Sequence, residues 1–242
     1  MKIAILGYGR MGKEVEQAAL EKGHEIVARI DHENDWDEQS ELLRKADVAI
    51  EFSTAQNAPE NIMRCFEVRL PVVSGTTGWL ERMDEIRAAC EEKKASFFYA
   101  PNFSIGVNVF FGINKYLAGS MKGLQGYEIS IQEEHHIHKA DSPSGTAIRL
   151  AQDIMQTSET KRGWTSSDKS DNDEISISSL REGNIPGTHT VLYESEHDII
   201  QIKHVAKSRK GFAAGAVMAA GWLIGKTGFF GMNDLIKTHP EQ

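Results

Sequence analysis

The sequence has few cysteines, no long apolar run and no surplus of basic residues. Its two cysteines, Cys65 and Cys90, exclude a disulfide framework and a cysteine-rich zinc site, and such a low count is typical of a reduced cytosolic protein. The first apolar run, Ile3 to Leu6, is too short for a signal-peptide core or a membrane span. The formal net charge of -8 argues against general nucleic-acid binding, which needs a basic surface. We therefore expect a cytoplasmic protein that binds neither membranes nor nucleic acids.

The first half of the chain alternates short apolar runs with longer amphipathic stretches. The apolar runs are Lys2 to Leu6, Glu25 to Ile30, Val48 to Phe52, Pro71 to Ser74 and Ser96 to Tyr99. Strands that alternate with helices at this spacing require crossover connections and a parallel sheet. The pattern predicts a Rossmann-type α/β domain.

The pattern changes after Gly126, where apolar and polar residues alternate with the period of half-buried strands. The alternating apolar residues are Tyr127, Ile129, Ile131, Ile175, Ile177, Val191, Tyr193, Ile200 and Ile202. They predict a second, α+β domain on a mixed or antiparallel sheet. Gly145 to Gln156 reads as a helix and Thr157 to Asp173 as an exposed loop. The alanine- and glycine-rich segment from Phe212 to Ile224 indicates a buried helix that is too short to span a bilayer.

Three glycines stand in the G-x-G-x-x-G pattern between the first predicted strand and the first predicted helix. Gly7 allows a tight turn, Gly9 lets the backbone approach a pyrophosphate, and Gly12 lets the helix pack close to the sheet. The free N–H groups and the dipole of the helix then point at the phosphates. The pattern predicts a dinucleotide site, and the alternative is a purely structural turn.

The sequence leaves the choice between NADH and NADPH open. Asp31 lies about 20 residues beyond the glycine loop, where a carboxylate accepts hydrogen bonds from ribose hydroxyls and repels a 2′-phosphate. Arg10 points the other way, because a guanidinium in the loop can hold that phosphate. We expect the protein to use both cofactors.

Glu133 to Asp141 is a dense cluster of ionisable residues, and three interpretations compete for it. A metal site is one, but His135 and His136 would face opposite sides of a strand and could not readily share an ion. A solvated strand end with ordinary surface charges is the second. The third is an anion site that also transfers protons. We expect no metal.

The anion-site interpretation has a physical mechanism. Asp141 to Thr146 resembles a helix entry, where small polar residues leave backbone N–H groups and the positive end of the helix dipole exposed. Lys139 adds a positive charge, and a charge-assisted hydrogen bond to an anion contributes roughly 1.5–3 kcal/mol. Histidine and lysine can both transfer protons in such a site. The cluster therefore suits a carboxylate substrate that is reduced, since each hydride requires a proton.

These residues make the chain resemble the dihydrodipicolinate reductase family, also called 4-hydroxy-tetrahydrodipicolinate reductase. The resemblance covers nearly the whole chain, although the glycine loop is one residue shorter than the family's common form. The matching segments are Gly7 to Gly12, Gly75 to Gly78, Ala100 to Asn108, Glu133 to Thr146, Arg181 to Gly183, Gly187 to His189, Ser208 to Arg209 and Phe212 to Ala216.

The resemblance implies a role for each part of these motifs. Gly7, Tyr8, Gly9, Arg10, Met11, Gly12 and Asp31 would bind the dinucleotide, and Gly75, Thr76, Thr77, Ala100, Pro101, Asn102 and Phe103 would line its nicotinamide end. His135 and Lys139 would serve proton transfer. His136, Ser144, Gly145 and Thr146 would bind the substrate.

The resemblance also implies a domain plan and an activity. Residues 1–103 with 213–242 would form the dinucleotide-binding domain, and residues 104–212 the substrate-binding and oligomerisation domain of a homotetramer. NADH or NADPH would reduce a small dicarboxylate, 4-hydroxy-tetrahydrodipicolinate, to tetrahydrodipicolinate in lysine and diaminopimelate biosynthesis. Two other functions remain open: a dehydrogenase for another amino or imino dicarboxylate such as aspartate, and a dinucleotide-sensing regulator without turnover.

Overall fold

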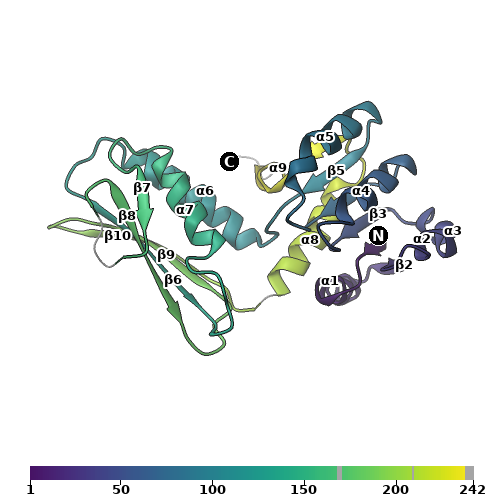
Figure 1. Cartoon of the computed structure of the whole chain (residues 1–242), viewed down its shortest axis with the longest axis horizontal. Coiled ribbons are helices and arrows are strands. Elements are labelled where there is room, and N and C mark those ends of the chain that lie inside the picture. Colours follow the sequence, from purple (N-terminus) through teal and green to yellow (C-terminus); the bar gives the residue numbers. More distant parts are fainter. Residues whose placement is uncertain (168–170, 209, 238–242) are drawn as a thin grey trace. The chain divides into compact units, whose positions relative to one another are not determined.

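The structure is a computed structural model of the chain and describes residues 1–167, 171–208 and 210–237. The chain forms two compact units, and most of their helices and strands are labelled in Figure 1. The first unit holds residues 1–105 and the segment from Lys210 onward, and the second holds the residues between them. The first unit is therefore discontinuous in sequence.

A six-stranded parallel sheet forms the centre of the first unit. Its strands are β1 (Lys2–Leu6), β2 (Glu25–Ile30), β3 (Val48–Glu51), β4 (Val72–Ser74), β5 (Ser96–Tyr99) and β11 (Gly228–Phe230). Their order is β11-β5-β4-β3-β1-β2. The five strands predicted in the first half are confirmed, and β11 was not predicted. The order reverses between β1 and β3, and ligands of such sheets bind beside this switch point at the carboxyl ends of the strands.

Helices cover both faces of this sheet. They are α1 (Arg10–Glu21), α2 (Asp35–Glu38), α3 (Ser40–Leu43), α4 (Ala58–Glu67), α5 (Met83–Glu92), α8 (Lys210–Leu223), α9 (Met232–Lys237) and the short 3₁₀ helix Leu80–Arg82. Ile3 and Ile5 pack in the cluster that contains α1 and α8, whereas Leu6 packs in the cluster that contains α4 and α5. Burying each such side chain contributes about 1.5–3 kcal/mol. The alternation along β1 therefore anchors both helical layers.

Small residues let α8 pack closely in the first unit, against α1, β3, β4 and β5. A Cβ added at Gly215 would lie 1.9 Å from the carbonyl oxygen of Phe103. Ala216 and Ala220 are fully buried in the same cluster. The C-terminal segment thus supports the loop that follows β5.

A five-stranded mixed sheet with the order β10-β9-β6-β8-β7 forms the second unit. Its strands are β6 (Glu128–His135), β7 (Gly163–Thr165), β8 (Glu174–Arg181), β9 (Thr188–Glu194) and β10 (Ile199–Val205). β6 runs parallel to β8 and antiparallel to β9. These findings confirm the predicted fold class of a Rossmann-type domain with a second domain on a mixed sheet. Thr157 to Asp173 was predicted to be an exposed loop. This prediction is wrong for Gly163–Thr165, which form β7. Residues 168–170 lie outside the described residues.

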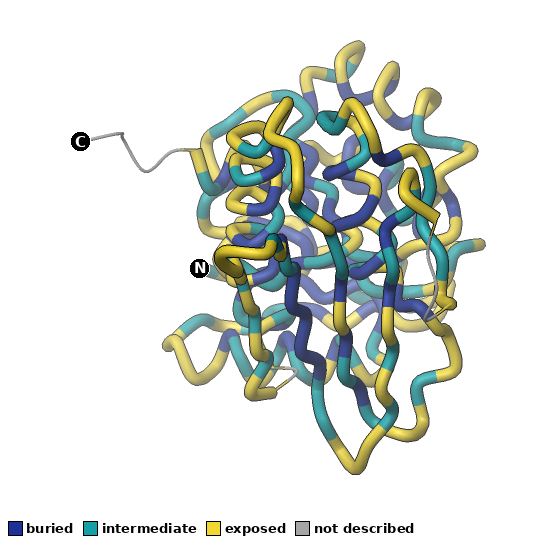
Figure 2. Tube along the Cα trace, turned by 90° about the vertical axis from the view of Figure 1, so that its left-hand side faces the viewer, coloured by how far each residue is buried: buried dark blue, intermediate teal, exposed yellow. Residues whose placement is uncertain are grey.

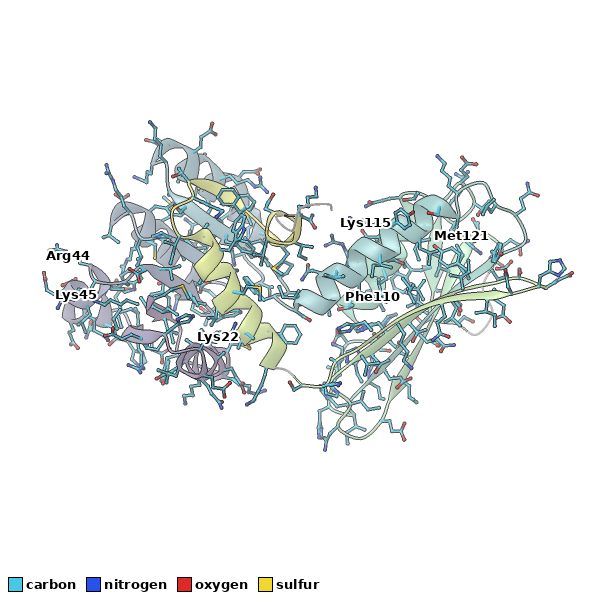
Figure 3. The ribbon with its side chains drawn as sticks, turned by 180° about the vertical axis from the view of Figure 1, so that it is seen from behind. Lys22, Arg44, Lys45, Phe110, Lys115 and Met121 are labelled. Carbon is cyan, nitrogen blue, oxygen red and sulfur yellow. The ribbon has the colours of Figure 1, made fainter. Side chains whose placement is uncertain are left out.

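Two helices, α6 (Ile105–Ser120) and α7 (Gly145–Met155), pack on one face of the second sheet. Phe110 of α6 is buried in the shared core, and Lys115 on the same helix pairs with Asp153 of α7 at 3.4 Å (Figure 3). In both units the buried residues come from strands and helices alike, and they alternate along the chain with exposed ones (Figure 2). Within the described residues, no helix has the length and apolar character needed to cross a membrane.

Candidate active site

The glycine loop joins β1 to α1 and leaves little space for side chains on its inner side. Gly7 has a φ of +87°, and a Cβ there would lie 2.4 Å from the carbonyl oxygen of Phe52. A Cβ at Gly12 would lie 2.2 Å from the carbonyl oxygen of Gly7, because α1 approaches the strand closely. A Cβ at Gly9, the N-cap of α1, would meet no atom within 4 Å. The loop is therefore open at Gly9, where the helix N–H groups can receive an anion.

Asp31 lies directly after β2 and is hydrogen-bonded to the glycine loop. Its Oδ1 accepts a 2.7 Å hydrogen bond from the backbone N–H of Tyr8, while 48% of its side chain remains exposed. The Tyr8 hydroxyl donates to Glu16, which also pairs with Arg29. The Arg29 guanidinium lies 5.6 Å from the centre of the Tyr8 ring. These contacts hold Oδ1 of Asp31 at the loop, whereas Oδ2 lies 4.0 Å from Nε2 of the exposed His32 and is within reach of a ligand.

Two of the predicted cofactor loops line one cavity in the first unit. The cavity has a volume of about 360 Å³ and is lined by Gly9, Arg10, Met11, Phe52, Ser53, Ala55, Gly75, Thr76 and Thr77. The loops come together because they follow strands whose carboxyl ends share one edge of the parallel sheet. An open N-terminus of α1 beside a cavity of this size fits the diphosphate part of a dinucleotide.

The loop from Ala100 to Phe103 follows β5 at the same edge of the sheet. Ala100 and Phe103 are each 2% exposed, and the Phe103 ring packs 5.8 Å from the Phe52 ring. Pro101 is exposed and Asn102 is half-buried. The two middle residues of this loop, Pro101 and Asn102, therefore lie nearer the surface, whereas Ala100 and Phe103 belong to the core beneath it.

Glu51, the last residue of β3, is a buried carboxylate that the sequence did not single out. Its oxygens accept hydrogen bonds from the Ser53 hydroxyl at 2.5 Å, the Ser74 hydroxyl at 2.5 Å and the Thr76 hydroxyl at 2.9 Å. Burial raises the pKa of Glu51, and these hydrogen bonds oppose that rise. Glu51 thus connects the loops after β3 and β4. The sequence contained one signal that could have identified this residue: a glutamate inside the apolar run from Val48 to Phe52 is expected to be buried.

The predicted proton-transfer residues lie at and after the end of β6 in the second unit. His135 is the last residue of the strand and is 8% exposed, whereas His136 is half-buried in the turn that follows. The Lys139 ammonium donates hydrogen bonds to both carboxylate oxygens of Asp141, at 2.7 and 2.8 Å. The bond from Lys139 lowers the pKa of Asp141. Asp141 is a partner of Lys139 that was not predicted.

Glu133 precedes His135 by two residues, so their side chains point to the same face of β6. The Glu133 carboxylate is 1% exposed. Its Oε1 accepts hydrogen bonds from Nη2 of Arg181 and from the Ser179 hydroxyl, both at 2.8 Å. Its Oε2 lies 3.6 Å from Nε2 of His135 and 3.6 Å from Nε2 of His189. We refer to Glu133, His135, Arg181 and His189 as the Glu133 cluster.

The charges within the Glu133 cluster follow from these contacts. Burial raises the pKa of Glu133, but the facing imidazoles of His135 and His189 and the hydrogen bonds from Ser144 and Arg181 outweigh that rise and hold the pKa well below its usual range. Burial lowers the pKa of His189, and the charge of His135 lowers it too, against the opposing effect of Glu133. The cluster therefore combines an ionised carboxylate with a His189 ring that favours the neutral form.

The N-terminus of α7 lies against this cluster through Ser144, its N-cap. The backbone N–H of Ser144 donates to both oxygens of Glu133 at 3.1 Å, and its hydroxyl accepts a 3.2 Å hydrogen bond from the backbone N–H of Ala147. The backbone N–H groups of Gly145 and Thr146 have no acceptor among the described residues. These two groups are the donors available to a carboxylate, and the dipole of the 11-residue helix favours an anion there.

Glu133, His135 and His189 also meet the spacing of a metal site, because one ligand atom from each lies within 4.8 Å of the others. In the chain that the structure describes, this is the one such group of three. The Arg181 guanidinium lies 2.8 Å from the Glu133 carboxylate, and its positive charge would repel a metal ion bound there. Hydrogen bonds already account for the oxygen atoms of Glu133. We interpret the group as a hydrogen-bonded network.

Arg181 and His189 were predicted to belong to family motifs, but no role was assigned to them. They lie on β8 and β9, the two strands that flank β6. Strand alternation indicated which residues share a face, but the sequence alone does not specify strand order. That order is what brings both side chains to Glu133.

Comparison with known proteins identifies the family. Residues 1–103 match the family model described as dihydrodipicolinate reductase, N-terminus, and residues 106–236 match the model described as dihydrodipicolinate reductase, C-terminus. The chain belongs to the dihydrodipicolinate reductase family. The predicted resemblance is thus confirmed, and so is the predicted enzyme class, since this is a family of nicotinamide-dependent oxidoreductases.

Relatives within the family match over the full length. The chain is 50% identical over 236 residues to a 4-hydroxy-tetrahydrodipicolinate reductase from Christiangramia forsetii, with 98% of both chains covered. It is 36% identical over 264 residues to one from Archaeoglobus fulgidus, with 98% of this chain and 100% of the relative covered.

A solved structure of the family also resembles this chain. The dipicolinate-bound dihydrodipicolinate reductase from Paenisporosarcina sp. TG-14 has a TM-score of 0.79 and 25% identity to it. The match covers 97% of this chain and 99% of that one. The fold therefore agrees with the family along the whole chain.

Proposed function

We propose that this reductase converts 4-hydroxy-tetrahydrodipicolinate to tetrahydrodipicolinate with NADH or NADPH, in lysine and diaminopimelate biosynthesis. The 50% identity over nearly the whole length of a relative with that name is the observation that carries the proposal. The chemistry of the site supports this function, because the N-terminus of α7, which can bind an anion, lies in the same unit as the proposed proton donors. A carboxylate substrate that is reduced would use the helix N-terminus for binding and the donors for proton transfer.

The first unit is proposed to hold the dinucleotide. Gly7 to Gly12 would bind the pyrophosphate at the N-terminus of α1, and Asp31 would accept hydrogen bonds from the adenosine ribose. Gly75 to Thr77 and Ala100 to Phe103 would line the nicotinamide end. The cavity beside Gly9 supports this assignment, since two of these loops line it.

Use of both NADH and NADPH is part of the proposal. The free oxygen of Asp31 favours NADH, because a carboxylate repels a 2′-phosphate. Arg10 is exposed at the cavity, and its guanidinium favours NADPH. Asp31 does not exclude NADPH, and Arg10 does not exclude NADH.

The second unit is proposed to bind the substrate and supply the proton. Gly145 and Thr146 would donate backbone hydrogen bonds to one carboxylate, with Ser144 shaping the helix entry and His136 contacting the substrate. The bound dinucleotide supplies a hydride to the ring carbon that loses its hydroxyl group. His135 or Lys139 supplies the proton, so that one substrate, one NAD(P)H and one proton give tetrahydrodipicolinate, NAD(P)⁺ and water.

The second unit is also proposed to form a homotetramer through the face of its sheet opposite α6 and α7. Exposed apolar side chains on the strands support this proposal. Leu180, Ile199 and Val205 are 49%, 56% and 55% exposed, and covering them would stabilise an assembly. We further propose that the enzyme works in the cytoplasm.

Substrate profiling tests the proposed function. The enzyme is incubated with NADH or NADPH and either freshly prepared 4-hydroxy-tetrahydrodipicolinate or oxaloacetate with ammonia. Oxidation that depends on the first substrate is expected. Faster oxidation with the second pair would assign the enzyme to another dicarboxylate, and dinucleotide binding without oxidation under any condition would indicate a sensor.

A further inference from the structure

The His135 imidazole is held from one side by the buried Glu133 cluster. Its Nε2 lies 3.3 Å from Nε2 of His189 and 3.6 Å from Oε2 of Glu133. The two imidazole rings meet edge to face, with their centres 5.1 Å apart. Nε2 of His135 is therefore the nitrogen that the cluster holds, and Nδ1 lies outside the cluster, on the side of Gly187.

The carboxylate that faces His135 is itself fixed by three hydrogen-bond donors. Arg181 and Ser179 donate to Oε1 of Glu133 at 2.8 Å, and the backbone N–H of Ser144 contacts both oxygens at 3.1 Å. Because Oε1 is occupied by two side-chain donors, Oε2 is the oxygen that remains for the histidines. A buried carboxylate with fixed donors keeps its position without reorganisation.

We propose that Glu133 is a positioning residue that sets the tautomer and orientation of His135 for proton transfer. Its negative charge favours a hydrogen on Nε2 of His135. Nδ1–H of the imidazolium can then give its proton to the substrate, and the ring that remains is the neutral tautomer with hydrogen on Nε2. This inference rests on the proposed role of His135 as proton donor.

His189 acts with Glu133 by accepting a hydrogen bond from His135. Its ring favours the neutral form, and a neutral imidazole with a free lone pair on Nε2 accepts from Nε2–H of His135. The same atom lies 3.1 Å from the Ser144 hydroxyl, so the helix cap shares this contact. The substrate cradle and the proton donor are thus connected through one residue.

The charge environment of His135 comes from several elements, and the carboxylate is its nearest charge. The titratable and charged residues in the surrounding contacts are Glu133 on β6, Arg181 on β8, His189 on β9, His204 on β10, and Lys139 and Asp141 in the turn after β6. Arg181 and Lys139 are cationic, whereas Glu133 is the carboxylate that faces Nε2 of His135. Loss of the Glu133 charge therefore removes the negative charge nearest to His135.

Glu133→Gln tests the proposal, because it keeps the shape of the side chain and removes its charge. The expected kcat falls about 10- to 1,000-fold, since mispositioned or mischarged acid–base histidines lose rates of this order. The dissociation constant for NADH should stay within about twofold. Glu128→Gln, which changes an exposed carboxylate on the same strand, is the matched control and should change none of these values.

A charge-balanced double variant separates positioning from structural support. If Glu133 merely neutralises Arg181, Glu133→Gln combined with Arg181→Gln should recover kcat. If Glu133 acts on His135, the double variant should remain slow, and it also covers the case in which the single variant does not fold. Recovery of kcat to within about threefold of the unmodified enzyme would overturn the proposal.

Nitrogen-15 NMR of the histidines, recorded without substrate, keeps this test independent of the proposed reaction. The proposal predicts that neutral His135 carries its hydrogen on Nε2 and that Glu133→Gln increases the other tautomer. An unchanged tautomer ratio would refute the positioning role even if the enzyme turned over the expected substrate. Conversely, a changed ratio in an enzyme that does not reduce that substrate would refute the proposed function alone.

Discussion

The backbone N–H of Tyr8 donates a 2.7 Å hydrogen bond to Oδ1 of Asp31. This contact joins the glycine loop to the end of β2, so the carboxylate is held where the ribose of a dinucleotide is expected. The arrangement makes Asp31 a structural partner of the loop, and we propose that it also discriminates between the cofactors.

Asp31→Asn should shift cofactor preference towards NADPH. The amide oxygen of asparagine can still accept the hydrogen bond from Tyr8, but it no longer repels a 2′-phosphate. We expect the ratio of kcat/KM for NADPH to that for NADH to rise about 5- to 50-fold, which corresponds to roughly 1–2 kcal/mol. Steady-state kinetics with both cofactors measure it, and an unchanged or lower ratio would show that Asp31 does not face the ribose.

Gly9→Ala should weaken NADH binding without lowering stability, whereas Gly12→Ala should lower the stability of the fold. A Cβ at Gly9 meets no protein atom within 4 Å, so this variant should keep its thermal stability but bind NADH about tenfold more weakly. A Cβ at Gly12 would lie 2.2 Å from a backbone oxygen, and overpacking of this kind costs about 1–3 kcal/mol. Thermal unfolding and NADH titration check the pair. Equal effects of the two variants on stability would contradict this account of the loop.

Replacing Lys139 or His135 by alanine should slow turnover without weakening NADH binding. General acid catalysis contributes about 10²- to 10⁴-fold, and the glycine loop belongs to the other unit. Stopped-flow turnover and NADH fluorescence titration provide the two readouts. Near-normal turnover of both variants would remove these residues from the mechanism.

Gly187→Ala should disturb His135 without touching any charge. Gly187 has a φ of +150°, and a Cβ there would lie 2.8 Å from Cε1 of His135. The imidazole would have to move, so kcat should fall about tenfold while NADH binding stays constant. The nearby Gly183→Ala is the control for backbone strain, since it also has a positive φ but its Cβ would meet no atom within 4 Å. Similar kcat values for both variants would argue against steric displacement.

The two buried glutamates should affect stability with opposite pH dependences. The folded-state pKa of Glu133 is lowered from 4.5, so its contribution is present above pH 4.5 and is lost as the pH falls further. The folded-state pKa of Glu51 is raised from 4.5, so the cost of burying its charge is greatest near neutral pH and fades as the pH falls towards 4.5. Urea unfolding between pH 4 and 8 should show that Glu133→Gln destabilises most at neutral pH, whereas any gain from Glu51→Gln shrinks towards acid pH. Parallel profiles would contradict these assignments.

The sequence predicted the elements of the site better than their contacts. Short apolar runs located β1 to β5, because strands buried on both faces are apolar throughout, and apolar–polar alternation located most of the second sheet, because burial on one face imposes a period of two. β7, with three residues, is too short to impose one. Glu133 was recognised as part of an ionisable cluster, but its partners Arg181 and His189 come from strands whose neighbours are set by tertiary packing. Glu51 was missed for the same reason, since its three hydroxyl donors come from the loop after β3, from the end of β4 and from the loop after β4.

Deuterium transfer from the cofactor tests the central claim most directly. Dideuterated NADH, labelled at both C4 positions, is mixed with the enzyme and freshly prepared 4-hydroxy-tetrahydrodipicolinate, and the product is examined by mass spectrometry. The account predicts one deuterium in each molecule of tetrahydrodipicolinate for each NADH oxidised, with little transfer by Lys139→Ala. Unlabelled product, or no oxidation of NADH or NADPH with this substrate, would contradict it.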